Sequence, residues 1–165
     1  MFEISDTTII IVTFKSSHLI QSCIKNITNK GAKIIIVDNG SKDNIEQTLK
    51  ENLTKNSNVE LIALENNCGF GKANNVALKK VKTKFSFLLN PDATTELESI
   101  KNLLKIFEYD EKIAIASSID TKTLKPSKEK IEKLIAHHRK NYKVFEENDK
   151  YLLTNFSSGG GSYFR

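Results

Sequence analysis

The sequence predicts an α/β fold in which a mostly parallel sheet is covered by helices on both faces. Runs of apolar and β-branched residues, typical of buried strands, alternate with segments whose apolar residues recur at helical spacing. Two of these runs, 34–37 and 85–89, lead directly into Asp38 and Asn90, and a glycine-rich turn lies between them. Ligands of open α/β sheets bind just beyond the carboxyl ends of strands, so we expect these three segments to line one pocket.

The first half of the chain contains three predicted strands and two predicted helices. Residues 8–14 are apolar and β-branched, as in a buried strand. Ser16 and Ser17 can cap a helix that extends to about Thr28, because apolar residues recur there every three or four positions. The other elements of this half are a strand at 33–37, a helix at 44–53 with Asp43 as its cap, and a strand at 59–64.

The second half continues this alternation before the pattern weakens. It predicts a helix at 71–81, a strand at 85–89, a helix at 96–107 and a strand at 113–118. Residues 120–149 are polar, lysine-rich and weakly periodic, which indicates an insertion that contains a helix. Residues 151–156 resemble another strand, and the glycine triplet at 159–161 would let the backbone approach a ligand or a neighbouring chain closely.

Composition indicates a soluble globular protein. The chain has 165 residues, most simply one domain, with 39% hydrophobic and 27% charged residues. Its longest apolar run is too short to span a bilayer, and the acidic start does not resemble a secretory signal, so we expect a cytoplasmic protein. Cys23 and Cys68 lack the close spacing of a metal or redox pair and are expected to be reduced thiols.

The net charge of +5 leaves two interpretations open. Much of the positive excess lies between Lys122 and Lys143, where a solvated helix face explains most of it. The alternative is a weak attraction to anionic lipid headgroups, which predicts peripheral contact with the inner face of the cell membrane. No helix-turn-helix, zinc-finger or aromatic RNA-binding signature is present, so we do not expect a nucleic-acid partner.

Three motifs suggest chemistry. Asp38 ends a buried strand, where its carboxylate can accept hydrogen bonds from a base or ribose, although a simple turn explains the same residues. Gly69-Phe70-Gly71 precedes a helix and offers backbone amides to a phosphate, or forms a tight turn with Phe70 as a buried plug. This turn follows the third strand and Asn74 occupies its last position, so a dinucleotide-binding enzyme is disfavoured.

The third motif is Asn90-Pro91-Asp92. Proline stops the strand, and a carboxylate placed there suits Mg²⁺ or Mn²⁺, which take oxygen ligands and share them with substrate phosphates. The alternative is an ordinary strand-ending turn. His18, His137 and His138 have no metal-ligand partners at useful spacing, and we assign no catalytic role to them.

Taken together and in order, four segments resemble family 2 glycosyltransferases of the GT-A fold, especially the rhamnosyltransferase-like members. The segments are Val12 to Lys15, Val37 to Asp43, Asn67 to Asn75, and Leu88 to Asp92, the last being similar to the family's Asp-x-Asp motif. The resemblance covers about residues 8–118, with a looser match at 151–165. It implies a transferase that uses a nucleoside-diphosphate sugar, UDP- or dTDP-linked, and a glycan or lipid-linked acceptor in cell-surface glycan or polysaccharide synthesis.

The resemblance also implies roles for individual residues. Base and ribose would be held by Thr13, Phe14 and Asp38. The wall of the donor pocket would be shaped by Asn67, Gly69, Phe70 and Asn75. Asp92 would hold Mg²⁺ or Mn²⁺ on the diphosphate, with Asn90 in support.

The chain departs from the family pattern at three places. Lys15 stands where Asn is usual, and Ala77 where Gly is frequent. The family's catalytic base follows its glycine strand, and none of the nearby acids matches that position, so we name no base. The nearby acids are Asp120, Glu146, Glu147 and Asp149.

We therefore divide the single domain into a donor-binding core at 1–118, a variable lysine-rich insertion at 119–150 and the start of an acceptor-side strand at 151–165. We expect the acceptor half to be missing. That edge, near Arg165, would expose apolar sheet surface and favour self-association. The alternative function is a truncated nucleotide-binding or assembly module of the same fold that transfers nothing.

Overall fold

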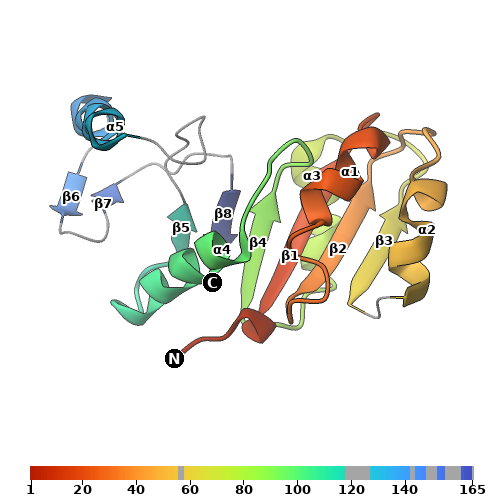
Figure 1. The fold of residues 1–165 in the computed structure, drawn as a ribbon, viewed down its shortest axis with the longest axis horizontal. Helices are drawn as coiled ribbons and strands as arrows, with labels where there is room; N and C mark the ends of the chain where they lie inside the picture. Colours follow the sequence, from red (N-terminus) through yellow and green to blue (C-terminus); the bar gives the residue numbers. More distant parts are fainter. Residues whose placement is uncertain (56–57, 118–126, 142–143, 148–151, 155–160, 165) are drawn as a thin grey trace.

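A computed structural model describes residues 1–55, 58–117, 127–141, 144–147, 152–154 and 161–164. The main sheet has six strands in the order β3-β2-β1-β4-β8-β5. Helices lie on both of its faces (Figure 1). The predicted α/β fold with a mostly parallel sheet is therefore confirmed. The strands of this sheet are β1 (Thr7–Thr13), β2 (Lys33–Asp38), β3 (Val59–Ala63), β4 (Phe85–Leu89), β5 (Ile115–Ser117) and β8 (Gly161–Phe164).

The helices fall close to their predicted positions. A short 3₁₀ helix, η1 (Ile4–Asp6), precedes β1, and a second, η2 (Lys105–Glu108), extends α4. The α-helices are α1 (Ser17–Ile24), α2 (Ile45–Lys55), α3 (Phe70–Leu78), α4 (Leu97–Leu104) and α5 (Lys128–Asn141). The helix predicted at 71–81 ends earlier, at Leu78, and the helix predicted to reach Thr28 ends at Ile24.

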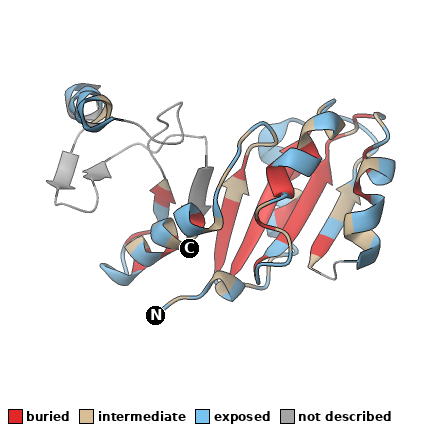
Figure 2. Cartoon of the chain, in the orientation of Figure 1, coloured by how far each residue is buried: buried red, intermediate tan, exposed pale blue. Residues whose placement is uncertain are grey.

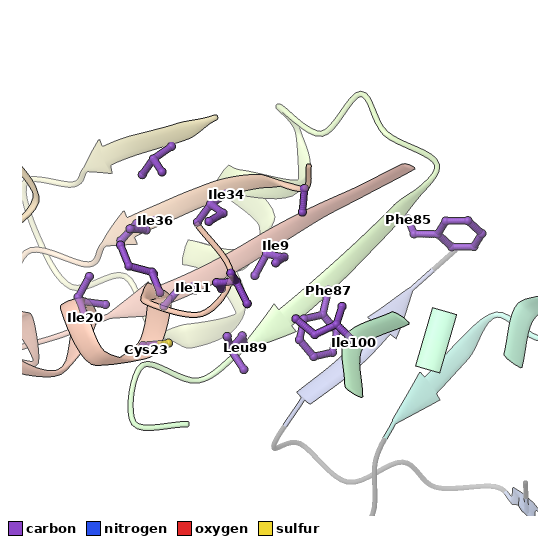
Figure 3. Close-up of a cluster of buried hydrophobic side chains, with 14 of the residues drawn as sticks. Ile9, Ile11, Ile20, Cys23, Ile34, Ile36, Phe85, Phe87, Leu89 and Ile100 are labelled. Carbon is purple, nitrogen blue, oxygen red and sulfur yellow. The ribbon is translucent and has the colours of Figure 1, made fainter. Parts of the chain in front are cut away.

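The central strand β1 is buried along its whole length, because it has strand neighbours on both sides and helices on both faces (Figure 2). Its side chains alternate between two hydrophobic clusters, as the two-residue repeat of a strand requires. Ile9 and Ile11 belong to the larger cluster, with α1, α2 and α4, whereas Ile10 and Val12 face α3. Figure 3 shows the larger cluster, in which Ile20 and Cys23 of α1 approach the isoleucines of β1 and β2.

The far side of the main sheet is antiparallel. β1 is parallel to β2 and β4, and β2 to β3, but β8 runs antiparallel between β4 and β5. A separate two-stranded sheet joins β6 (Val144–Glu147) to β7 (Leu152–Thr154), within the region predicted as an insertion and a following strand. Asp120, Asp149 and Arg165 lie outside the described residues.

Candidate functional site

The carboxyl ends of β2, β1 and β4 lie side by side at one edge of the sheet. Thr13, the last residue of β1, is in register with Asp38, the last residue of β2. On the other side of β1, Leu89 at the end of β4 pairs with Ile11. The chain runs from β1 outward to β3 and then returns to β4 across β1, so the strand order reverses between β1 and β4. Such reversal points are where open α/β sheets bind ligands.

Asp38 is buried, with 6% of its surface exposed, and only one of its two carboxylate oxygens accepts hydrogen bonds from described residues. Its Oδ1 atom accepts hydrogen bonds from the backbone N–H of Ser41, at 3.1 Å, and from the Ser41 hydroxyl. No hydrogen bond within the described residues reaches Oδ2. Asp38 also borders an open depression of about 690 Å³, but this depression extends along α2, for example past Glu46 and Lys50, and neither Thr13 nor Asp92 lines it. Oδ2 is thus the oxygen that remains for a ligand.

Asn39 joins the end of β2 to the glycine-rich turn. Its side chain is buried, and its amide donates to Oδ1 of Asn67 at 3.0 Å while its oxygen accepts from the backbone N–H of Cys68 at 2.9 Å. Oδ1 of Asn67 also accepts from the N–H of Gly69 at 2.9 Å. These bonds bring Asn67 and Gly69 to the end of the strand that carries Asp38. The sequence pattern had not indicated this role for Asn39.

Thr13 and Phe14 lie where β1 leaves the sheet. Thr13 is 1% exposed, and its hydroxyl has no hydrogen-bond partner within the described part of the chain. A buried hydroxyl without a partner is unfavourable, so Thr13 leaves an unsatisfied polar atom at the end of β1. Phe14 is 40% exposed. The ammonium of Lys15 lies 5.3 Å from the centre of the Phe14 ring, within range of a cation–π contact.

The glycine-rich turn leads directly into α3. Gly69 has φ of 85° and stands immediately before the first helical residue, Phe70. Phe70 is 55% exposed, so the alternative interpretation of this turn, with Phe70 as a buried plug, was wrong. The side chain fixed at this point belongs instead to Asn74, which is buried and donates from Nδ2 to the Phe70 carbonyl at 3.0 Å. Asn75 is exposed on the same helix.

Asp43 contradicts a second expectation. It was predicted to cap the helix that follows it, but its Oδ2 accepts from the backbone N–H of Ser17, at the start of α1, at 3.0 Å. The Ser17 hydroxyl donates to the Asp43 carbonyl, also at 3.0 Å. Asp43 therefore caps α1 from a neighbouring loop, because the end of β2 lies beside the start of that helix. This contact fixes the loop that leaves Asp38.

The Asn90-Pro91-Asp92 turn packs against α1. The carbonyl of Asn90 accepts from the N–H of Ala93 at 3.1 Å and from the thiol of Cys23 at 3.5 Å. Burial, with a smaller contribution from the negative charge of Asp92, raises the pKa of the Cys23 thiol to about 12. Cys23 therefore stays protonated at neutral pH and can donate to this turn. Both cysteines are free thiols, as expected.

The Asp92 carboxylate is exposed and forms no ion pair with any described residue. The described residues also contain no cluster of three or more His, Cys, Asp or Glu side chains that could hold a metal ion by itself. Mg²⁺ is commonly held by one or two carboxylates, with substrate phosphates and water as its other ligands. The donor set at Asp92 fits an ion that is held in part by a diphosphate.

Comparison with known proteins identifies the family. The model of the family described as "Glycosyl transferase family 2" matches residues 8–165. The chain belongs to this family. The match includes β1 from Thr8 onward and all of β2, α3 and β4, and therefore every residue of the candidate site described above.

Individual relatives match a smaller part of this chain than the family model does. This family 2 chain is 31% identical over 96 residues, or 56% of its length, to a teichoic acid poly(glycerol phosphate) polymerase of Staphylococcus epidermidis, of which it covers 13%. It shares its fold with TarS 1-349 of S. aureus, at a TM-score of 0.55 and 23% identity over 64% of this chain and 33% of that one. It also shares its fold with the mannosyltransferase PcManGT of Pyrobaculum calidifontis, at a TM-score of 0.60 and 19% identity. That match covers 67% of this chain and 34% of PcManGT.

The remaining observations concern groups outside the site. His18 is exposed on α1 and takes part in no described contact of the site. Within the described residues, no helix is long and apolar enough to cross a membrane. The rhamnosyltransferase-like subtype, the sugar and the base are not distinguished by the family match.

Proposed function

We propose that this family 2 chain binds a nucleoside-diphosphate sugar, UDP- or dTDP-linked, and that its sugar is transferred to an acceptor hydroxyl in cell-surface glycan or polysaccharide synthesis. The observation that carries the proposal is the meeting of Thr13, Asp38 and the Asn90-Pro91-Asp92 turn at one sheet edge. The buried Asp38 carboxylate, with one oxygen left without a hydrogen bond, and the buried Thr13 hydroxyl suit a nucleoside, and the exposed Asp92 carboxylate suits a metal ion on a diphosphate.

In this proposal the β1 and β2 ends bind the nucleoside. Oδ2 of Asp38 accepts a hydrogen bond from the ribose or base, and the Thr13 hydroxyl gains the partner that it lacks. Phe14 is exposed beside them and offers its ring to the base. The turn and helix start that carry Asn67, Gly69, Phe70 and Asn75 form the wall of the donor pocket.

Asp92, supported by Asn90, would hold Mg²⁺ or Mn²⁺ on the donor diphosphate. Such an ion would stabilise the negative charge that develops on the leaving diphosphate. The solved structure of PcManGT, in complex with GDP-Man and Mn2+, supports the use of a divalent ion by this fold. The Asn90 turn keeps Asp92 at the end of β4, and Cys23 fixes that turn through its hydrogen bond to the Asn90 carbonyl.

The acceptor proposal rests on the relatives. One is a teichoic acid poly(glycerol phosphate) polymerase, and TarS has been solved with UDP-GlcNAc. We propose a glycan or lipid-linked acceptor at the inner face of the cell membrane, reached through peripheral contact. A rhamnose donor remains a hypothesis from sequence resemblance. This chain spans about a third of the solved relatives, and we assign no catalytic base to it.

A thermal-shift titration with UDP, dTDP and GDP, each with Mn²⁺ and with EDTA, tests the proposal. A ligand at about 100 times its dissociation constant stabilises by roughly 2.7 kcal/mol, so binding raises Tm measurably. We expect one nucleotide to shift Tm with Mn²⁺, and Asp92→Ala to remove the metal dependence. Glu51→Ala, which deletes an exposed carboxylate on α2, is the matched control and should shift like the wild type.

The same titration separates the proposal from its alternative. Metal-dependent binding together with turnover of the matching donor sugar supports a transferase. Binding without donor hydrolysis or transfer, even at high protein concentration, supports a nucleotide-binding module of the same fold. If no nucleotide shifts Tm, or if binding ignores both metal and Asp92, the donor-site proposal is wrong.

A further inference from the structure

The hydroxyl of Ser41 connects two loops of the candidate site. It donates to Oδ1 of Asp38, and it accepts from the backbone N–H of Lys15 at 2.9 Å. Asp38 ends β2, whereas Lys15 follows β1, so one side chain joins the ends of two neighbouring strands. Ser41 is itself buried, at 8% exposure, and its bond to Asp38 is buried whereas its bond from Lys15 is partly buried.

The backbone around Ser41 shows that this arrangement is specific. Lys15 and Lys42 both have φ of 55°, in the left-handed region that residues with side chains rarely adopt. Such conformations persist where the surrounding structure enforces them, and they concentrate at functional sites. At Lys15, the hydrogen bond from its N–H to the Ser41 hydroxyl helps to hold the backbone in this conformation.

We propose that Ser41 is a positioning residue for the nucleoside part of the donor. The inference rests on the proposed function. By binding Oδ1, Ser41 fixes the orientation of the Asp38 carboxylate and leaves Oδ2 for the ligand. By accepting from Lys15, it also sets the path of the loop that presents Phe14. Ser41 touches no reacting atom in this proposal and acts only through Asp38 and this loop.

The test uses Ser41→Ala and whichever nucleotide binds the wild-type chain best with Mn²⁺. Because the variant loses a hydrogen bond to a charged group and leaves the Lys15 N–H without its partner, we expect about tenfold weaker nucleotide binding. Ser41→Thr retains the hydroxyl and should recover most of the affinity. Ser5→Ala is the control, since its exposed hydroxyl donates to Glu3 ahead of β1, at the opposite end of that strand from the site, and it should bind within about twofold of the wild type.

Two further measurements distinguish positioning from general damage. Binding of Mn²⁺ with inorganic pyrophosphate should be unchanged in Ser41→Ala, because Ser41 contacts nothing at Asp92. In an Asp38→Ala background, Ser41→Ala should weaken nucleotide binding much less than in the wild type, since loss of the carboxylate already removes the interaction through which Ser41 acts.

The outcomes separate this inference from the proposed function. If the wild-type chain binds no nucleotide, the proposed function itself fails. If the wild type binds but Ser41→Ala binds equally well, only the positioning role is overturned. It is also overturned if pyrophosphate binding falls in parallel, or if the Asp38 and Ser41 effects are fully additive.

Discussion

Gly40 shows at the scale of a single residue how closely the site loops approach one another. Its φ is +77°, and a Cβ atom placed on it would lie 2.6 Å from the backbone carbon of Asn66. Only glycine avoids both the left-handed strain and this contact. This close approach of the two backbones lets the Asn39 side chain form a hydrogen bond with that of Asn67 in the other loop. Glycine at position 40 therefore keeps the two loops in contact.

We predict that Gly40→Ala destabilises the protein by roughly 2 to 4 kcal/mol, combining the cost of a left-handed side-chain residue with that of overpacking. Gly71→Ala is the matched control, because a Cβ atom placed on Gly71 would meet nothing within 4 Å and the residue is already helical. That change should be neutral or stabilise by up to about 1 kcal/mol. Urea unfolding of the two variants measures both effects, and equal midpoints would contradict the close approach at Gly40.

Asp43 marks the limit of sequence reasoning at this scale. Its position before a helical segment predicts a cap for that helix, but the N–H group that it binds belongs to Ser17, 26 residues earlier. Local sequence carries no signal for such a contact, because it depends on β1 and β2 being neighbours. The role of Ser41 was missed for the same reason, since its partner Lys15 lies across that strand pair.

At the scale of elements, α3 is distinguished by the small residues that it places on the sheet. Ala73 and Ala77 are completely buried against Ile10, Val12, Ile35 and Val37. Small side chains let the helix backbone lie close to the strands, which also sets the position of the turn at its start. The sequence difference at Ala77, where the family frequently has Gly, therefore retains the small size that this contact requires.

We predict that Ala77→Leu destabilises the protein by about 1 to 3 kcal/mol, because a close-packed interface has no room for three additional carbons. Leu78→Ala removes a 38%-exposed side chain from the same helix and should cost less than about 1 kcal/mol. The free energy of unfolding in denaturant measures both. A larger loss for Leu78→Ala than for Ala77→Leu would show that α3 does not pack closely on the sheet.

Element types were predictable because the periodicity was strong. The strand at 85–89 falls at its predicted residues, and the other strands among the first four differ by one or two residues at their ends. Strand order was less accessible. Nothing local indicates that Gly161–Phe164 inserts antiparallel between β4 and β5, since such pairing joins residues about 75 positions apart in the sequence. The glycine triplet had suggested only a close backbone approach.

At the scale of the whole molecule, the sheet order predicts a gradient of local stability. β1 is hydrogen-bonded on both sides and buried on both faces. β3 pairs only with β2 within the described residues, and Leu61 and Ile62 at its centre are half-exposed. Opening β3 therefore exposes less apolar surface and breaks one ladder, whereas opening β1 disrupts both hydrophobic clusters at once.

We predict that amides of β1 exchange with deuterium only through global unfolding, while the β3 amides that donate to β2 exchange through a smaller opening. Native-state hydrogen exchange at increasing denaturant measures this, since global openings depend on denaturant as strongly as unfolding itself and local ones depend on it weakly. Because the candidate site joins the ends of β1, β2 and β4, the proposed nucleotide should slow exchange of Ser41 and Gly69 more than that of β3. Equal protection of β1 and β3, with equal denaturant dependence, would mean that the sheet unfolds as one unit and that its edge is no weaker than its centre.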